Sequence, residues 1–574
     1  MNNLIEVRRR TAQSAPIFPE EMPSILQRVY ANRGIGHIDE LDLSVKGLLH
    51  FNQLTDCEKA AERIGQAILA GESICICGDF DADGATSVAL LMSFFRTINH
   101  GKAFYLVPNR FSDGYGLSPT LAQYAHDEGA NLLITVDNGI SSHAGVSKAN
   151  ALGMQVIITD HHLPSSELPD AYGIVNPNRR DCAFASKQLA GVGVAFYLLL
   201  ALRAWFKEQQ PNHAAASIKI AEYLDLVALG TVADVVPLDY NNRILVRQGL
   251  ARIRGGVCRP GISALLAVAG RDASKITALD LGFSVGPRIN AAGRLDDIQQ
   301  GIECLLAQDL PSAQILALRL DELNQQRRKI ETTMQEEAQA CLARLKVDEA
   351  ELPLVLTIYD EQFHQGVIGI VAGRLKEQFY RPVMVFAEAE DGTLKGSCRS
   401  VMGVHIRDLL EQVASEFPDV ITKFGGHAMA AGLSVPKAQW AEFNIAVQHV
   451  AKRWVDSEAL ARVLWSDGEL QPHEFNLDVA GALQHAGPWG QSFPQPMFDG
   501  QFRIIQERWL KDVHLKLVVQ PMGSKQMFDA IAFNVPRANW QWNSPAEANL
   551  VFKLDVNEFR GQRNVQLLIE HVQA

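Results

Sequence analysis

The stretch CICGDFDADGATS, residues 75–87, carries three aspartates at alternate positions. They are Asp79, Asp81 and Asp83. The spacing matches the start of an EF-hand calcium loop, which also needs a glutamate at its twelfth position. The twelfth position here is Leu90, and the residues before Asp79 form the unbroken apolar run of a buried strand. The carboxylates therefore serve something other than an EF-hand.

Other apolar runs also lead into acidic or imidazole side chains. NLLITV leads into Asp137, MQVIIT leads into Asp160, His161 and His162, and VALGTVA leads into Asp234. Between about residues 50 and 235, strand-like and helical runs alternate, which predicts βαβ units and a mostly parallel sheet. Because ligands bind beyond the carboxyl ends of such strands, we expect these side chains to lie close together.

Carboxylates crowded at one sheet edge repel one another unless cations neutralise them. A single aspartate of this kind could be a turn or helix-capping residue, but several strand ends together favour a shared metal site. Oxygen ligands with an imidazole suit Mg²⁺ or Mn²⁺, and this many ligands indicates two ions. Two neighbouring ions favour in-line hydrolysis of a phosphodiester.

The elements that must position these residues belong to a chain of 574 residues, long enough for several domains. We expect an N-terminal segment (1–49), an α/β domain (50–308), a long helix (309–346), a smaller α/β domain (347–455) and a C-terminal β-barrel or sandwich (456–574). The long helix could join two lobes or pack on the surface of one domain.

The composition, 47% apolar and 21% charged, is typical of a soluble globular protein. We find no run of about 20 apolar residues and no apolar segment after the basic N-terminus, so we expect neither a membrane span nor a secretory signal. Eight scattered cysteines without a CxxC pair fit reduced thiols in a cytoplasm. The net charge of −12 argues weakly against a nucleic-acid-coated protein, but a phosphate track needs only local arginines.

The motifs DFDADG, VDNGI, TDHH and ADVVPL resemble the four motifs of the DHH phosphoesterase family. The segments VPNRFSDGYGLS, SVGPRINAAGR, FHQGVIGIVAGRL, GSCRS and FGGHAMAAGLSV resemble its RecJ branch, the single-strand-specific 5′→3′ DNA exonucleases. The resemblance runs in order from about residue 50 to the C-terminus. It implies an α/β fold with a parallel-sheet DHH phosphoesterase domain, a long connecting helix, a smaller α/β DHH-associated domain and a C-terminal OB-like β-barrel.

The family pattern also implies roles for single residues. The first metal would be held by Asp81 and Asp137, with Asp79 beside it. The second would be held by Asp83, Asp137, His161 and Asp234, so that Asp137 bridges the two. His162 would face the scissile phosphate or support the ligands, and Asp160 would orient an imidazole. Some DHH relatives have a histidine where this chain has Cys77, which we interpret as a buried strand residue.

A second set of residues is implied to grip the nucleic acid strand and its 5′ end. The set comprises Arg110, Tyr115, Arg288, Asn290, Ser397, Arg399, Gly425, Gly426 and His427. Guanidinium forks and backbone N–H groups suit phosphates, and an aromatic ring suits a base. Each has an ordinary alternative: a surface ion pair for an arginine, packing for Tyr115, and a glycine turn with a capped histidine at His427.

The resemblance implies a cytoplasmic, monomeric exonuclease that degrades single-stranded DNA 5′→3′ in repair and recombination, with two Mg²⁺ or Mn²⁺ ions per active site. Implied partners are a single-strand-binding protein and a helicase, with no membrane. One alternative is a DHH phosphodiesterase acting on short oligonucleotides or cyclic dinucleotides, which usually lacks the OB-like domain. Another is a non-catalytic replication scaffold, in which the metal motifs are degraded.

Overall fold

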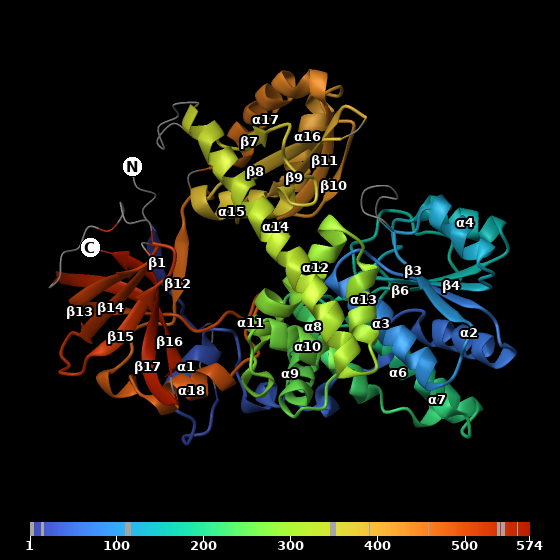
Figure 1. Cartoon of the computed structure of the whole chain (residues 1–574), viewed down its shortest axis with the longest axis horizontal. Helices are drawn as coiled ribbons and strands as arrows, with labels where there is room; N and C mark the ends of the chain where they lie inside the picture. Colours follow the sequence, from blue (N-terminus) through green and yellow to red (C-terminus); the bar gives the residue numbers. More distant parts are fainter. Residues whose placement is uncertain are drawn as a thin grey trace. The chain divides into compact units, whose positions relative to one another are not determined.

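The structure is a computed structural model that describes residues 5–12, 17–108, 116–344, 352–389, 391–456, 458–511, 513–535, 540, 546–559 and 561–573. Arg110 and Tyr115 lie outside the described residues. The chain forms two compact units (Figure 1). The larger unit comprises residues 9–322 and 466–574, and the smaller unit comprises residues 1–8 and 323–465. The helices in the described part of the chain are all too short or too polar to cross a membrane.

The larger unit contains a parallel five-stranded sheet of order β3-β2-β4-β5-β6. Its strands are β2 (Ile74–Cys77), β3 (Ala103–Leu106), β4 (Leu132–Val136), β5 (Gln155–Thr159) and β6 (Gly173–Val175). Every residue of β2 and β4 is buried, as expected of parallel strands covered on both faces. Cys77 is fully buried at the end of β2, which agrees with its interpretation as a strand residue.

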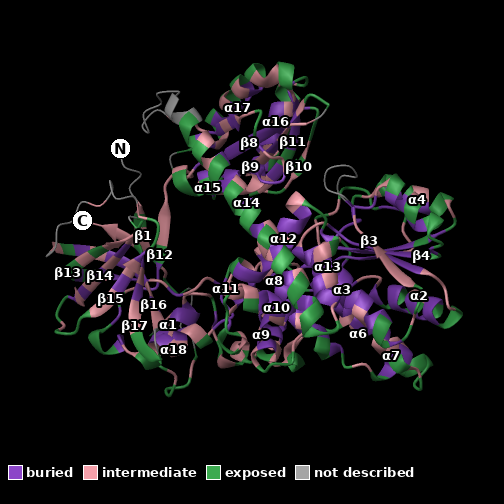
Figure 2. Ribbon diagram, in the orientation of Figure 1, coloured by how far each residue is buried: buried purple, intermediate pink, exposed green. Residues whose placement is uncertain are grey.

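The larger unit also contains helices between residues 24 and 306. They are α1 (Ser24–Ala31), α2 (Cys57–Ala70), α3 (Ala82–Thr97), α4 (Pro119–Asp127), α5 (His143–Ala151), α6 (Gly191–Gln209), α7 (Ala214–Ser217), α8 (Leu224–Ala233), α9 (Tyr240–Arg254), α10 (Pro260–Val268), α11 (Ala278–Asp280), the π-helix η6 (Leu281–Val285), α12 (Gly286–Leu295) and α13 (Gln299–Leu306). Helices α3 and α8 are drawn mainly in purple in Figure 2 because most of their residues are buried. Both helices carry predicted metal ligands at one end, so their packing fixes the site.

The predicted long helix is α14 (Leu310–Arg344), which runs from the larger unit into the smaller one. The smaller unit has a mixed sheet of order β10-β11-β9-β8-β7. Its elements are β7 (Leu356–Tyr359), α15 (Ile368–Phe379), β8 (Val383–Glu388), β9 (Thr393–Arg399), α16 (Ile406–Glu416), β10 (Lys423–Gly426), β11 (Ala430–Pro436) and α17 (Trp440–Trp454). A separate pair of strands joins β1 (Glu6–Arg9) to β12 (Val463–Ser466).

The C-terminal region of the larger unit is a closed five-stranded barrel of order β13-β14-β15-β17-β16. It consists of α18 (Leu477–His485), β13 (Phe498–Leu510), β14 (His514–Pro521), β15 (Phe528–Ala532), β16 (Ala546–Phe559) and β17 (Gln562–Gln573). The barrel region is joined to the helical region of its unit, since Leu238 N–H donates to Gln491 O (2.8 Å) and Lys275 pairs with Glu558 (2.9 Å). Because the barrel is closed, the backbone N–H and C=O groups at the edges of its strands pair within the barrel itself.

Helix α9 crosses α8 at Gly249, where a Cβ atom would lie 2.1 Å from Leu224 O. Gly249→Ala should therefore lower the free energy of unfolding by about 1–3 kcal/mol through overpacking. Gly481 in α18 is the matched control, because a Cβ there would meet nothing within 4 Å. Gly481→Ala should raise the free energy of unfolding by about 0.5–1 kcal/mol. Urea denaturation measures both changes, and equal effects would contradict the packing shown here.

Candidate metal centre

The three aspartates of the first motif lie in the turn between β2 and α3 or in the first turn of α3. Asp81 is the N-cap of α3, and its Oδ1 accepts the N–H groups of Asp83 (2.9 Å) and Gly84 (3.2 Å). Asp79 and Asp83 are 3% and 1% exposed. A Cβ at Gly84 would lie 2.7 Å from the backbone of Asp79, so the tight turn depends on that glycine.

Asp83 is held by the first turn of α6. Its Oδ2 accepts Gly191 N–H at 2.6 Å, and its Oδ1 accepts Val192 N–H at 2.9 Å. A helix N-terminus offers free N–H groups and a favourable dipole, so it stabilises the carboxylate. Gly191 also leaves room for Asp137, because a Cβ there would lie 2.6 Å from the Cβ of Asp137.

Asp137 follows β4 in the left-handed region with φ 62°, an uncommon backbone conformation for a residue other than glycine. Its N–H donates to Thr159 O at 3.0 Å, which joins the end of β4 to the end of β5. The next residue, Asn138, donates its side-chain amide to Cys77 O (3.1 Å) and Val136 O (2.9 Å). These bonds hold the carboxyl ends of β2, β4 and β5 together, as the parallel-sheet argument predicts.

His161 stands at the meeting point of three carboxylates. Its Nε2 lies 3.1 Å from Asp137 Oδ1, 3.5 Å from Asp234 Oδ2 and 3.9 Å from Asp83 Oδ2. Burial and the neighbouring His162 lower the pKa of His161 below its usual value. A neutral imidazole is the form that binds a metal ion.

His162 is oriented by Asp160. The Nδ1 of His162 lies 2.8 Å from Asp160 Oδ1, and the other carboxylate oxygen accepts Ile140 N–H at 2.9 Å. Burial alone would lower the pKa of His162, but the Asp160 carboxylate outweighs it and raises the pKa to about 9. Burial likewise acts to raise the pKa of Asp160, but the bond to His162 holds it below its usual value. The two histidines of one motif therefore differ in charge.

Asp234 reaches the centre from a helix, although the apolar run before it could equally have been a strand. That run forms α8, and Asp234 is its C-cap. Length and periodicity cannot separate a short buried strand from a short buried helix, and α8 is buried over most of its surface. The result is a ligand set drawn from three strand ends and one helix end.

These residues form three overlapping groups of possible ligands. Within each group, the ligand atoms all lie within 4.8 Å of one another. They are Asp79, Asp81 and Asp137; Asp83, His161 and Asp234; and Asp137, His161 and His162. Burial and the charge of Asp234 raise the pKa of Asp83 to about 7, while burial and the charge of Asp81 raise that of Asp234 to about 8. Burial and the charge of Asp83 also raise the pKa of Asp137. Hard oxygen ligands that carry like charges, and therefore repel one another, fit divalent cations such as Mg²⁺ or Mn²⁺.

Two residues predicted to bind the strand lie on α12, close to the metal centre. Asn290 accepts the Ala82 N–H with its Oδ1 at 2.7 Å, so it braces the turn that carries the aspartates. Arg288 is 8% exposed, pairs with Asp321 at 2.8 Å and donates to Ser284 O at 2.5 Å. Its guanidinium is thus already engaged within the larger unit.

The remaining predicted strand-binding residues lie on strands of the smaller unit, except His427, which directly follows β10. Gly432 of β11 pairs with Gly425 of β10 on one side and with Ser397 of β9 on the other. Arg399 pairs with Ala430, whose carbonyl accepts the His427 N–H at 2.8 Å.

The same sheet positions bring a cation and a hydroxyl to the start of α15. A Cβ at Gly369 would lie 3.0 Å from Ser397 Oγ and 3.1 Å from Arg399 Nη2. Arg399 donates to Ser397 Oγ (3.2 Å) and Cys398 O (2.8 Å), and burial lowers its pKa. Both of these acceptors are uncharged, so the guanidinium keeps its positive charge available and the arrangement suits an anion.

The sequence analysis missed three contributors to the centre, namely Asn138, Gly191 and Val192. Two of them act through backbone N–H groups, which no side-chain pattern reveals. The two glycines in AGVGVAF before a long apolar helix were the available signal, since they mark a close backbone approach. Asn138 is fully buried, and its position directly after Asp137 was the other signal.

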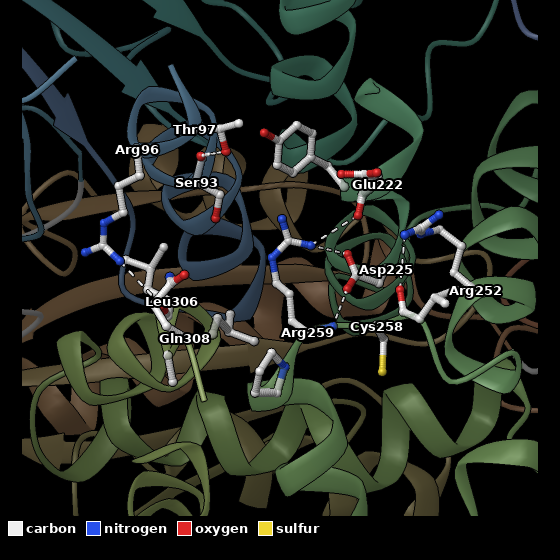
Figure 3. Close-up of a pocket in the computed structure, with 15 residues that line it drawn as sticks. Ser93, Arg96, Thr97, Glu222, Asp225, Arg252, Cys258, Arg259, Leu306 and Gln308 are labelled. Carbon is white, nitrogen blue, oxygen red and sulfur yellow. Dashed lines mark hydrogen bonds and ion pairs between the residues drawn. The ribbon is translucent and has the colours of Figure 1, made fainter. Parts of the chain in front are cut away.

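A hollow of about 400 Å³ lies elsewhere in the larger unit and is lined by Arg96, Arg252 and Arg259 (Figure 3). Arg259 reaches Asp225, with which it forms an ion pair. Arg96 is in the last turn of α3. The helical rise therefore puts it about 20 Å from the predicted ligands at the start of α3. The hollow is separate from the metal centre.

Comparison with known proteins agrees with this architecture. The DHH family N-terminal domain matches residues 73–231, the DHHA1 domain matches 352–455, and the RecJ OB domain matches 466–571. The single-stranded-DNA-specific exonucleases RecJ of Escherichia coli and of Dickeya dadantii are each 52% identical to this chain over the full length of both proteins. The chain belongs to the RecJ family. The fold class predicted from sequence is confirmed.

Solved structures of the RecJ family show the same fold. RecJ from Thermus thermophilus in complex with Mn²⁺ matches with a TM-score of 0.80 and 28% identity, over 100% of this chain and 80% of that one. The Mg²⁺ complex of the same protein matches with a TM-score of 0.73 and 27% identity, over 96% of this chain and 74% of that one. The metals named in both structures are those that the ligand chemistry here favours.

The crowding of carboxylates makes a prediction that needs no activity assay. In chelator at pH 8.5, Asp234→Asn should melt about 2 °C or more above the wild type, because a charge disfavoured by burial is removed. With Mn²⁺ the order should reverse, since the variant has lost a ligand. Differential scanning calorimetry measures both. Asp160→Asn is the control and should melt below the wild type in both conditions. If Asp234→Asn melted above the wild type both with and without Mn²⁺, the assignment of Asp234 as a ligand would be contradicted.

Proposed function

We propose that this chain is a single-stranded-DNA-specific exonuclease that hydrolyses phosphodiesters 5′→3′ in DNA repair and recombination, using two Mg²⁺ or Mn²⁺ ions. The observation that supports it most is the meeting of Asp83, Asp137, His161 and Asp234 within one buried, negatively charged centre. The names of the full-length relatives support the substrate.

The proposed roles follow the groups of ligand atoms. Asp79, Asp81 and Asp137 would hold one ion, and Asp83, Asp137, His161 and Asp234 would hold the other. When bound, the two ions supply a metal-activated hydroxide and neutralise charge on the phosphate.

The chain's own residues would orient the substrate and donate hydrogen bonds to it. Asp160 fixes the ring of His162 and keeps it protonated, so that His162 can donate a hydrogen bond to the scissile phosphate. Ser397 and Arg399 on β9, beside the start of α15, would hold a strand phosphate, with Gly425 and Gly426 on β10 and His427 directly after it. Arg288 and Asn290, with Arg110 and Tyr115, would complete the path of the strand.

Both rival functions are less well supported. A phosphodiesterase for short oligonucleotides or cyclic dinucleotides would not need the barrel, which matches the RecJ OB domain. A non-catalytic scaffold would not need an intact set of ligands, and this chain retains all of them. We therefore favour a long single strand as substrate.

Further parts of the proposal concern organisation and setting. We assign the DHH catalytic domain to residues 50–308, the connecting helix to 309–346, the DHH-associated domain to 347–455 and the OB-like domain to 456–574, after an N-terminal segment of 1–49. We propose a monomer that acts in the cytoplasm with a single-strand-binding protein and a helicase. The free thiols of the described cysteines are consistent with a reducing compartment.

The polarity and substrate class can be tested directly. Single-stranded DNA, single-stranded RNA and duplex DNA, each labelled at one end, are incubated with Mg²⁺ or Mn²⁺, and the products are sized. We expect single-stranded DNA to be shortened from its 5′ end and duplex to be resistant. Asp137→Ala should abolish cleavage, because Asp137 is shared by both proposed ion sites. Digestion from the 3′ end, or near-normal turnover by Asp137→Ala, would refute the assigned roles.

The proposed phosphate contact of Arg399 predicts a change in salt dependence. Arg399→Gln should weaken binding of single-stranded DNA and reduce the slope of log affinity against log salt by about 0.7, the value for one lost phosphate contact. Fluorescence anisotropy at several salt concentrations gives the slope. Arg453→Gln is the control, because Arg453 is exposed and pairs with Glu416. Equal slopes for wild type and Arg399→Gln would remove Arg399 from the binding surface.

A further inference from the structure

Two exposed apolar side chains flank the end of α8 that carries Asp234. Val235 is 62% exposed and Phe283 is 74% exposed. Single apolar residues on a protein surface are common, so exposure alone would carry little weight. Both residues, however, also have an unusual backbone setting.

Val235 lies in the left-handed region with φ 60°, directly after the C-cap of α8. Its N–H donates to Val232 O at 3.2 Å, so it terminates the helix. Glycine normally occupies this position, because a Cβ atom is strained there, and a β-branched residue is a true outlier. Strain of this kind is concentrated at functional sites, where the side chain contributes something other than stability. The exposed isopropyl group of Val235 is therefore placed beside a metal ligand at a cost to the fold.

Phe283 belongs to the π-helix η6. Helices of this form are rare in proteins, and those that occur are often found at functional sites. Its neighbours Leu281, Ser284 and Val285 are buried, so η6 is firmly packed while the ring of Phe283 faces solvent. Ser284 is anchored further, since its hydroxyl accepts Arg271 Nε at 3.2 Å. The ring is thus held out from a well-ordered support.

The two residues belong to adjoining elements, because η6 rests on the last turn of α8. A Cβ at Gly282 would lie 3.0 Å from Val232 Cγ1, and a Cβ at Gly286 would lie 3.0 Å from the Cβ of Ala233. Helix α12 continues from η6, and its Asn290 bonds to the metal-binding turn at Ala82. Val235 and Phe283, here together called the apolar ledge, are therefore two exposed apolar residues on elements that adjoin the predicted metal ligands.

We propose that the apolar ledge is a base-binding site, on which a nucleobase of the substrate strand stacks while a nearby phosphate lies in the metal centre. This inference rests on the proposed function. The ledge itself offers an aromatic face and an aliphatic group, which suit a base and not a phosphate. Stacking on a ring tolerates every base, as an enzyme that degrades any sequence requires.

The test uses a short, 5′-phosphorylated single strand in which one abasic residue is moved stepwise along the chain. The wild-type protein should lose about tenfold in kcat/KM at the one or two positions where a base contacts the ledge. Phe283→Ala should lose about tenfold in kcat/KM on the intact strand, and an abasic residue at those positions should lower its kcat/KM no further. Phe283→Trp should restore both the activity and the abasic penalty. Val257→Ala, an exposed apolar residue that lines the hollow of Figure 3, should behave as wild type.

The outcomes separate the ledge from the proposed function. A wild-type protein that fails to degrade any single strand sinks the proposed function. Normal degradation with the same abasic penalty in wild type and Phe283→Ala overturns the ledge alone. Val235→Gly provides an independent readout, with a melting temperature no lower than wild type but a raised KM for the strand. A clear fall in melting temperature would show that Val235 is kept for packing, against the inference.

Discussion

Mutual repulsion among buried carboxylates is the constraint on which the rest of the larger unit depends. Asp83, Asp137 and Asp234 all have raised pKa values, because they are buried and close to one another. Left to relax, such groups would separate or take up protons. The fold prevents their separation by fixing each carboxylate through a different rigid element, and the raised pKa values are the consequence. A centre that resists its own charges in this way is prepared to bind cations without rearrangement.

The supports are largely backbone groups, and this explains the local sequence. Asp83 is held by the N-terminal amides of α6, and Asp81 by the amides of the turn that it caps. A fixed amide cannot rotate away as a side chain can, so it holds the carboxylate oxygen atoms in place. Glycine at positions 84 and 191 is the consequence, since any Cβ there would collide with Asp79 or Asp137.

Sequence reasoning located most of the centre because parallel strands deliver their C-terminal residues to one edge, which is a local property of the chain. Asp79, Asp137 and His161 could be placed in this way, and the structure brings them together. The sequence pattern could not show that the run before Asp234 is a helix, because a buried segment lacks the polar face that would reveal its periodicity. Nor could it show that Gly425 and Ser397 flank Gly432, since strand register depends on long-range pairing.

The distribution of arginines follows from the same repulsion. A guanidinium near the metal centre would pair with the ligands and compete with the cations for them. Arg288, on the helix that braces the centre, is instead neutralised by Asp321. Arg399 lies on β9 of the other unit, where Ser397 and a carbonyl are its hydrogen-bond acceptors. Separate cores thus allow one chain to keep an excess of carboxylate for cations and an available guanidinium for a phosphate, without each cancelling the other.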